Sequence, residues 1–385
     1  MKYRTLGNTG LQVSEIAMGS EGIEGKSHEE LKVLLETCLA CGINFFDLFN
    51  PNPKTRKNFG KVMAGRRKDF IIQGHICTVW QDRQYLRTRD IDLVRESFKN
   101  LLKDLGTDYI DVGMIHYVDK QEDLEGILNG PVLEYAKELK TKGIIKSIGI
   151  STHSTEIAFK AIESGTIEVV MFSINPAYDM RPGADIIEDL GEEKNYADNT
   201  LNGMDKERER LYQTCAAKDI AITVMKAFAG GMLLDEKKSP FNVALTPIQC
   251  LHYALTRPAV SAVMAGCLSP EQVREVVRYC DCTEAEKDFS ITLSTAPRHS
   301  YTGKCMYCGH CSPCIVGIDI AMVNKYLDLA LSISTDAIPD TIKDHYGLLE
   351  HHASECISCD ACEANCPFDV KIIEKMAEAT KVFGI

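Results

Sequence analysis

Eight short apolar runs recur along residues 1–290, and amphipathic segments lie between them. The runs are SEIAMG, INFFD, FIIQGHI, YIDVGMIH, IKSIGIS, VVMFSIN, AITVMKAF and AVSAVMAG. Intervening stretches such as HEELKVLLETCLACG and IDLVRESFKNLLKDLG repeat apolar residues at spacings of three and four, the period of a helix. Strands that read as continuous apolar runs are buried on both faces, as in parallel sheets. Eight strand–helix units therefore predict an α/β chain folded as a (β/α)8 TIM barrel.

The alternative with the same alternation is a doubly wound open sheet. That fold would place a GxGxxG fingerprint after the first strand, and MGSEGIEG fits it poorly. Glycines at the ends of four helical segments are expected to cap them, because glycine adopts a positive φ without strain. These are Gly42, Gly106, Gly143 and Gly165.

Composition sets limits on the class of protein. The chain has 385 residues, 45% of them hydrophobic, and a net charge of -12. No apolar run reaches the roughly 18 residues of a membrane span, and the opening MKYRTLGNTGLQVSEI lacks the apolar centre of a signal peptide. We therefore expect a cytoplasmic protein with no membrane partner. The acidic balance argues against nucleic acid as a partner.

The sixteen cysteines divide the chain, since eight lie before residue 300 and eight after it. In a cytoplasmic chain, clustered cysteines indicate metal or redox chemistry more often than disulfides. We place the barrel at residues 1–290 and a small cysteine-rich domain at residues 291–385. The tail contains CMYCGHCSPC and CISCDACEANCPF, which carry the predicted metal ligands Cys305, Cys308, Cys311, Cys314, Cys356, Cys359, Cys362 and Cys366.

The second motif has the spacing C-x2-C-x2-C-x3-C-P and resembles the bacterial ferredoxins. Three thiolates on one tight loop can hold three corners of a cluster, and in two-cluster ferredoxins the fourth comes from the other motif. The resemblance implies two [4Fe-4S] clusters. One would be held by Cys305, Cys308, Cys311 and Cys366, and the other by Cys356, Cys359, Cys362 and Cys314. Structural zinc is the alternative. The insert beginning IDIAMVNKYLDLALSIS reads as helical and favours a mostly helical iron–sulfur domain.

Chemistry in a (β/α)8 barrel takes place at the carboxyl ends of the strands. Four predicted strands end at or beside an ionisable side chain, and these are the candidate catalytic residues Asp47, His75, His116 and Lys226. Their convergence on one mouth would give groups suited to acid–base work, provided that burial moves their pKa values toward neutrality.

Residues 1–285 resemble the aldo/keto reductases. The matching stretches are KYRTLGNTGLQVSEIAMG, GINFFD, LKDLGTDYIDVGMIH, GIIKSIGIS, AITVMKAFAGGML and MAGCLSPEQV. The family uses an Asp, Tyr, Lys and His tetrad and a nicotinamide dinucleotide across the top of the barrel. Asp47 and His116 match the family's aspartate and histidine, whereas Asn52 stands at the tyrosine position and His75 at the lysine position. The resemblance therefore implies a changed acid–base system, in which His75 and His116 form a pair, or a different redox reaction.

The same resemblance implies which residues would contact the cofactor. They are Ser151, Thr152, Asn175, Met225 and Gly266, which follow the last four strands. Gly266 leads to a helix whose free N–H groups can hold a phosphate. Thr152 and Met225 depart from the family's usual asparagine and aromatic residue, so NADPH, NADH and a flavin all remain open as cofactors.

These features predict an iron–sulfur oxidoreductase of anaerobic metabolism. It would move electrons between a small organic substrate at the barrel mouth and a carrier such as ferredoxin, through two [4Fe-4S] clusters. One alternative is an NAD(P)H-dependent carbonyl reductase whose clusters are structural. Another is a catalytically silent barrel that acts as an electron-transfer subunit.

Overall fold

The fold is taken from a computed structural model of the whole chain. It describes residues 1–183, 190, 193–197, 201, 203–296, 299, 301, 303–332 and 338–385.

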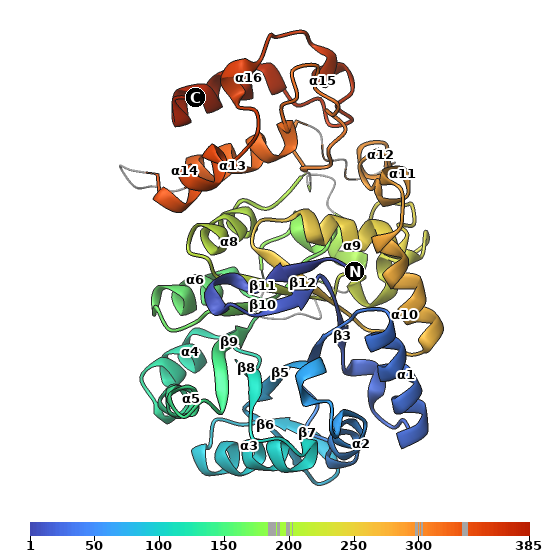
Figure 1. Cartoon of the computed structure of the whole chain (residues 1–385), viewed down its shortest axis with the longest axis vertical. Helices are drawn as coiled ribbons and strands as arrows, with labels where there is room; N and C mark the ends of the chain where they lie inside the picture. Colours follow the sequence, from blue (N-terminus) through green and yellow to red (C-terminus); the bar gives the residue numbers. More distant parts are fainter. Residues whose placement is uncertain are drawn as a thin grey trace.

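Eight parallel strands close into a barrel, which confirms the fold predicted from the apolar runs (Figure 1). The order around the barrel is β10-β11-β12-β3-β4-β5-β8-β9. The strands are β3 (Ile16–Gly19), β4 (Phe45–Leu48), β5 (Ile71–Ile76), β8 (Ile110–Ile115), β9 (Ile145–Ser151), β10 (Val169–Ser173), β11 (Ala221–Met225) and β12 (Val260–Ala265).

Helices surround the barrel. They are α1 (His28–Ala40), α2 (Pro53–Met63), α3 (Ile91–Leu105), α4 (Gln121–Leu128), α5 (Pro131–Thr141), α6 (Thr155–Glu163), α8 (Lys206–Ala217), α9 (Pro247–Thr256) and α10 (Pro270–Val277). Gly106 ends α3 at a φ of 66°, and Gly42, Gly143 and Gly165 also have positive φ, as expected for caps. The described residues also form short 3-10 turns, at Gly7–Thr9, Glu21–Ile23, Arg67–Asp69, Tyr178–Met180, Glu193–Tyr196, Ala229–Leu234, Arg278–Cys280 and Ala353–Glu355.

Alternation along the strands decides which side chains enter the barrel. Phe45, Val112, Met171 and Met264 form one buried cluster with other inward-facing residues. Asp47 lies two residues after Phe45 on β4 and therefore points the same way. The interior thus becomes polar toward the carboxyl ends of the strands, where the predicted site lies.

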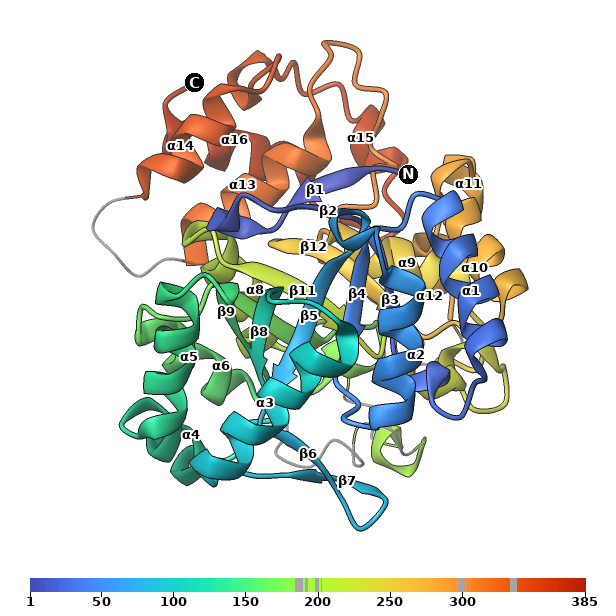
Figure 2. The same cartoon turned by 60° about the horizontal axis from the view of Figure 1, so that its bottom comes forward.

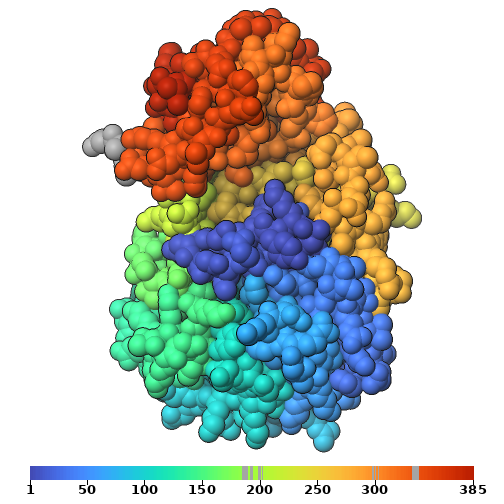
Figure 3. Space-filling view, in the orientation of Figure 1, coloured from blue at the N-terminus to red at the C-terminus, as the bar shows by residue number. Residues whose placement is uncertain are grey.

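A hairpin of β1 (Tyr3–Thr5) and β2 (Gln12–Ser14) covers the amino-terminal ends of the strands. Ser261 donates to the carbonyl of Thr5 at 3.0 Å and fixes the hairpin to β12. Figure 3 shows these first residues, in dark blue, at the surface beneath the tail.

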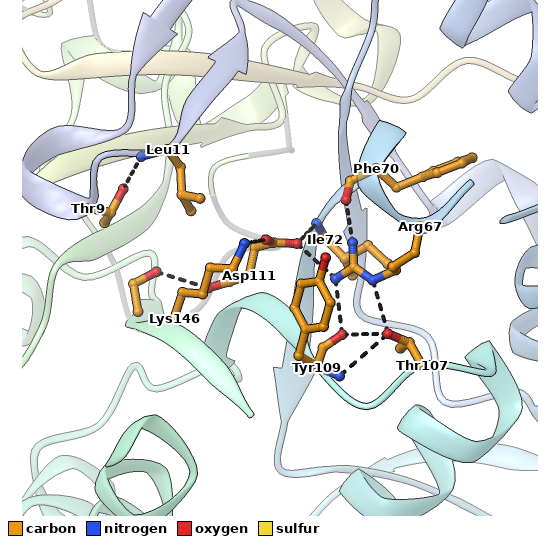
Figure 4. A network of polar contacts seen from close by, with 10 residues as sticks. Thr9, Leu11, Arg67, Phe70, Ile72, Thr107, Tyr109, Asp111 and Lys146 are labelled. Atoms are coloured by element: carbon orange, nitrogen blue, oxygen red, sulfur yellow. Dashed lines mark hydrogen bonds and ion pairs between the residues drawn. The ribbon is translucent and has the colours of Figure 1, made fainter. Parts of the chain in front are cut away.

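Charged side chains stabilise the same end of the barrel at the start of β8. Asp111 accepts from Arg67 at 2.9 Å and from Lys146 at 2.7 Å, and the guanidinium of Arg67 lies 4.0 Å from the centre of the Tyr109 ring (Figure 4). Because this end lies away from the strands' carboxyl ends, we assign the network to stability.

A second hairpin, β6 (Thr78–Gln81) and β7 (Gln84–Arg87), follows β5 and projects from the barrel (Figure 2). In Figures 1 and 2 it lies at one end of the molecule, with the tail at the other.

In the described residues of the tail, the regular elements are helical. They are α12 (Ser290–Ser294), α13 (Ile320–Ser332), α14 (Asp340–Gly347), α15 (Ala361–Ala364) and α16 (Ile372–Phe383), after the short α11 (Glu284–Lys287). Helix α13 packs against α16 and against α8 of the barrel. Tyr346 stacks on Phe383 with ring centres 3.9 Å apart, which joins α14 to α16.

Within the part of the chain that the structure describes, no helix combines the length and apolarity needed to cross a bilayer.

Candidate active site and cysteine cavity

Three of the predicted catalytic side chains meet at the barrel mouth. His75 Nε2 lies 2.9 Å from Asp47 Oδ1, and His75 Nδ1 lies 2.6 Å from His116 Nδ1. Strand β5 pairs with β4 on one side and β8 on the other, so their ends are neighbours. All three side chains are buried, with exposed fractions of 3%, 3% and 8%.

Two further polar residues hold the aspartate. Gln73, two positions before His75 on β5, donates from Nε2 to Asp47 Oδ1 at 2.7 Å. Thr223, across the barrel on β11, donates to Gln73 Oε1 at 3.3 Å. Asp47 thus receives an amide N–H as well as the imidazole, and these partners satisfy its buried carboxyl oxygen.

The second histidine is held as a neutral ring. Burial lowers the pKa of His116 well below its usual value, and charge on His75 and Arg89 lowers it further. The ring of Phe49 stacks on His116, with planes 7° apart and centres 6.0 Å apart.

A tyrosine that the sequence patterns did not single out completes this group. Tyr85, on β7, places its hydroxyl 2.6 Å from His116 Nε2. Burial raises the pKa of Tyr85, and the charges of Arg87 and Arg89 act in the opposite direction. The sequence feature that could have indicated this hairpin is the run TVWQDRQYLR. Its residues alternate as in a hairpin, but it has no glycine at the turn.

Asn52, at the position of the family's tyrosine, has a structural role. Its side-chain oxygen accepts from the N–H groups of Lys54 and Thr55 and caps α2. Its Nδ2 donates to Glu24 at 3.0 Å.

The predicted cofactor residues lie on the other half of the mouth, after β9 to β12. Ser151 Oγ accepts from the Tyr117 N–H at 2.8 Å, and Thr152 donates to Asp119 at 2.9 Å. Met225 ends β11 and is partly buried. Gly266 is exposed and precedes α10, whose N-cap is Ser269.

Asn175 and Lys226 are joined to each other. Asn175 Nδ2 donates to the Lys226 carbonyl at 2.9 Å, while its Oδ1 accepts from two backbone N–H groups of the following turn. Lys226 directly follows β11, which lies across the barrel from β5 and β8, the strands that position the histidine pair.

A second acid–histidine pair lies beside these residues and was not predicted. His153 Nδ1 is 2.8 Å from Asp119 Oδ2, and both side chains are buried. Among the described residues, His153 Nε2 has no hydrogen-bond partner although it is buried. The only sequence signal was the position of His153 just beyond the end of a strand.

The tail contains a cavity lined by four cysteines from both motifs. Cys305, Cys308, Cys311 and Cys366 form its wall together with Tyr307, His310, Asn324 and several apolar residues. These are the four that the ferredoxin resemblance grouped around one cluster. Asn324 is fully buried, and its Oδ1 has no partner among the described residues.

Burial raises the pKa of the Cys311 thiol to about 12, with smaller contributions from Cys308, Cys366 and Cys362. The two motifs therefore lie side by side. No three His, Cys, Asp or Glu side chains of the described residues converge so as to hold a metal ion. The cysteines grouped around the second cluster are more open: Cys359 is exposed, whereas Cys314, Cys356 and Cys362 are partly buried.

Comparison with known proteins gives matches across the barrel. The aldo/keto reductase family model matches residues 15–247. The uncharacterized oxidoreductase YqkF of Bacillus subtilis (strain 168) is 23% identical over 286 residues, which are 72% of this chain and 90% of that protein. The NADH-specific methylglyoxal reductase of Escherichia coli (strain K12) is 24% identical over 195 residues, 44% of this chain and 58% of its own length.

Among solved structures, aldo-keto reductase AKR11C1 from Bacillus halodurans in its holo form superposes with a TM-score of 0.59 at 22% identity. The alignment covers 74% of this chain and 94% of that one. This likeness shows the barrel fold, and the family match ends before the cysteine-rich tail begins.

Proposed function

Since the chain belongs to the aldo/keto reductase family and is an oxidoreductase, we propose that it transfers electrons to or from a small organic substrate at the barrel mouth. Asp47, His75 and His116 would manage the protons, and the tail would carry two [4Fe-4S] clusters that exchange electrons with a carrier such as ferredoxin. The observation that carries this proposal is the cavity walled by the four cysteines expected to share one cluster.

The thiol groups around this cavity support the proposal of such a cluster. A four-iron cluster is held at its corners by thiolates that surround a space, whereas a zinc ion needs its ligands to converge on one point. Four cysteines line a cavity here, but no three side chains converge on an ion among the described residues. The buried Oδ1 of Asn324, also in the wall, lacks a protein partner, so the wall is not packed as an ordinary core. When bound, the clusters would supply single electrons at low potential.

The division of polar residues between the two halves of the mouth supports an organic cofactor there. Strands β4, β5 and β8 supply the acid–base residues, and β9 to β12 supply Ser151, Thr152, Met225 and Gly266 on the opposite half. A substrate between the two halves would contact both. A nicotinamide would supply hydride there, and a flavin would pass electrons singly or in pairs.

The second candidate function is an NAD(P)H-dependent carbonyl reductase whose clusters serve only the fold. The β6–β7 hairpin contacts the barrel mouth through Tyr85. This hairpin and the tail lie at opposite ends of the molecule in Figures 1 and 2, and the separation of the tail from the hairpin favours clusters that take no part in the reaction.

Anaerobic purification of the full chain, followed by iron and sulfide analysis, tests the cluster assignment. We expect about eight irons per chain, and about four after Cys366→Ser, because one of two four-iron clusters loses a ligand. Cys41→Ser is the matched control and should keep all of the iron. Zinc in place of iron, or full iron content in Cys366→Ser, would contradict the assignment.

Addition of NADPH or NADH then separates the two functions. Reduction of the clusters, seen as bleaching and an electron paramagnetic resonance signal, supports one electron path through barrel and tail. Oxidation of the nucleotide by small aldehydes while the clusters keep their oxidation state supports the reductase with structural clusters.

A further inference from the structure

We propose that Tyr85 is the proton-exchanging catalytic residue of this mouth and that it is the outer end of a relay formed by Tyr85, His116, His75 and Asp47. The inference deepens the proposed function and rests on it. It assigns the missing tyrosine role to a hydroxyl supplied by the β6–β7 hairpin and not to the position of Asn52. Three contacts carry it, at 2.6, 2.6 and 2.9 Å, and they join the four side chains end to end.

When both imidazole rings are neutral, the three contacts determine which atom donates in each hydrogen bond of the relay. An ionised Asp47 can only accept, so His75 carries its proton on Nε2 and leaves Nδ1 as an acceptor. His116 must then donate from Nδ1 to His75, which leaves its Nε2 as an acceptor. Tyr85 therefore donates its hydroxyl proton to His116, and its oxygen is able to accept a proton from a substrate hydroxyl.

One additional proton reverses the bond between the two rings and the bond between His116 and Tyr85, whereas His75 Nε2 still donates to Asp47. A protonated His75 stays paired with Asp47 and donates from Nδ1 to His116, which then holds its own proton on Nε2 and donates to the oxygen of Tyr85. The hydroxyl proton of Tyr85 is now directed outward. His116 remains neutral in both states, in agreement with the low pKa that burial gives it.

This relay accounts for the proton that the reduction of a carbonyl consumes. A reduced nicotinamide, when bound, would supply the hydride that the carbonyl carbon takes up, and Tyr85 gives its proton to the carbonyl oxygen. His116 reprotonates Tyr85, and His75 reprotonates His116 and becomes neutral. The net change is one proton from His75 to the product alcohol, and oxidation of an alcohol runs the same steps backward.

Exposure and anchoring place Tyr85 at the outer end. It is only partly buried, whereas the other three members are exposed by 8% or less. Arg87 donates to the carbonyl of Tyr117 at 2.8 Å, and Arg89 donates to those of His116 and Tyr117 at 3.0 Å. Arg89 is itself paired with Asp123 at 2.7 Å. The segment that follows Tyr85 is thus fixed to the loop after β8, which carries His116.

The kinetic test is Tyr85→Phe in the full-length protein, with reduction of methylglyoxal and other small aldehydes as the probe. We expect kcat to fall about 10²–10⁴-fold with KM nearly unchanged, because a positioned acid contributes that much to a transition state. Tyr109→Phe is the matched control, since its ring lies at the other end of the barrel. A Tyr85→Phe enzyme with the wild-type kcat would overturn the proposal.

A second test needs no substrate. Long-range proton–nitrogen NMR of the ¹⁵N-histidine-labelled full chain reports which ring nitrogen carries the proton. With both rings neutral, we expect His75 to be protonated on Nε2 and His116 on Nδ1, and we expect the His116 Nε2 resonance to shift in Tyr85→Phe. A neutral His116 protonated on Nε2 would refute the relay. If the tautomers agree but the wild type neither reduces carbonyls nor oxidises alcohols, the proposed function fails while the relay stands.

Discussion

At the scale of single residues, the barrel mouth contains a buried nitrogen that no described protein group satisfies. His153 Nε2 points away from Asp119, which holds the opposite nitrogen of the ring. Buried polar atoms usually have partners, so an unpaired one beside Ser151 and Thr152 is suited to contact a bound molecule. This pair is separate from the His75–His116 pair, on the half of the mouth assigned to the cofactor.

We therefore expect His153→Phe to weaken binding and to leave proton transfer intact. KM for the substrate or the nucleotide should rise about fivefold with kcat changed little, since one such hydrogen bond is worth about 1 kcal/mol. Steady-state kinetics with each ligand varied in turn would measure it. A fall in kcat alone would place His153 in the proton chemistry instead.

The placement of Asp47, His75 and His116 at one mouth could be predicted from the sequence, because strand alternation and the polarity of the barrel decide it. Their catalytic roles remain predictions. Tyr85 could not be foreseen, because its hydroxyl reaches His116 through the tertiary position of a hairpin. Asp119 was missed for a similar reason, since only the folded chain brings it to His153.

At the scale of elements, the β6–β7 hairpin is built with a strained turn. Asp82 and Arg83 have φ values of 52° and 63°, a region that glycine and asparagine enter more easily than arginine does. Because this turn lacks the usual Asn-Gly signal, the hairpin was not predicted, whereas the eight barrel strands were. Ser97 on α3 donates to the Thr78 carbonyl at 2.5 Å and holds the base of the hairpin.

Relief of this strain should stabilise the hairpin without a change in chemistry. In Arg83→Gly, we expect hydrogen exchange of the β6–β7 amides to slow about fivefold, since the left-handed conformation costs a non-glycine residue roughly 1 kcal/mol. Mass spectrometry of the peptides from this segment would measure the rate. Faster exchange would mean that the entropy of glycine in the unfolded hairpin outweighs the strain.

At the scale of the whole molecule, buried contacts join the tail to the barrel. Arg257, 1% exposed at the end of α9, donates to the carbonyl of Met306 at 2.6 Å and lies 4.6 Å and 5.4 Å from the ring centres of Tyr253 and Tyr307. Tyr301 donates to the carbonyl of Pro176 at 2.5 Å. These contacts involve residues on both sides of the predicted boundary near residue 290.

Arg257→Met should accordingly destabilise the whole protein. The Met306 carbonyl would be left buried without its donor, which costs about 1–3 kcal/mol. We expect a lower Tm and faster proteolysis within residues 303–332, measured by calorimetry and limited digestion. Arg274→Met, on the exposed face of α10, is the control and should match the wild type. Equal Tm values for both variants would show that barrel and tail are energetically independent.

The contact between Arg257 and Met306 also has a consequence for how the chain is made. The donor leaves the ribosome 49 residues before its acceptor. At roughly 5–20 residues per second, the Arg257 guanidinium stays exposed for several seconds before the tail that covers it has been synthesised. Nascent barrels would therefore expose this surface of α9 during synthesis, and a chaperone has this interval in which to bind it.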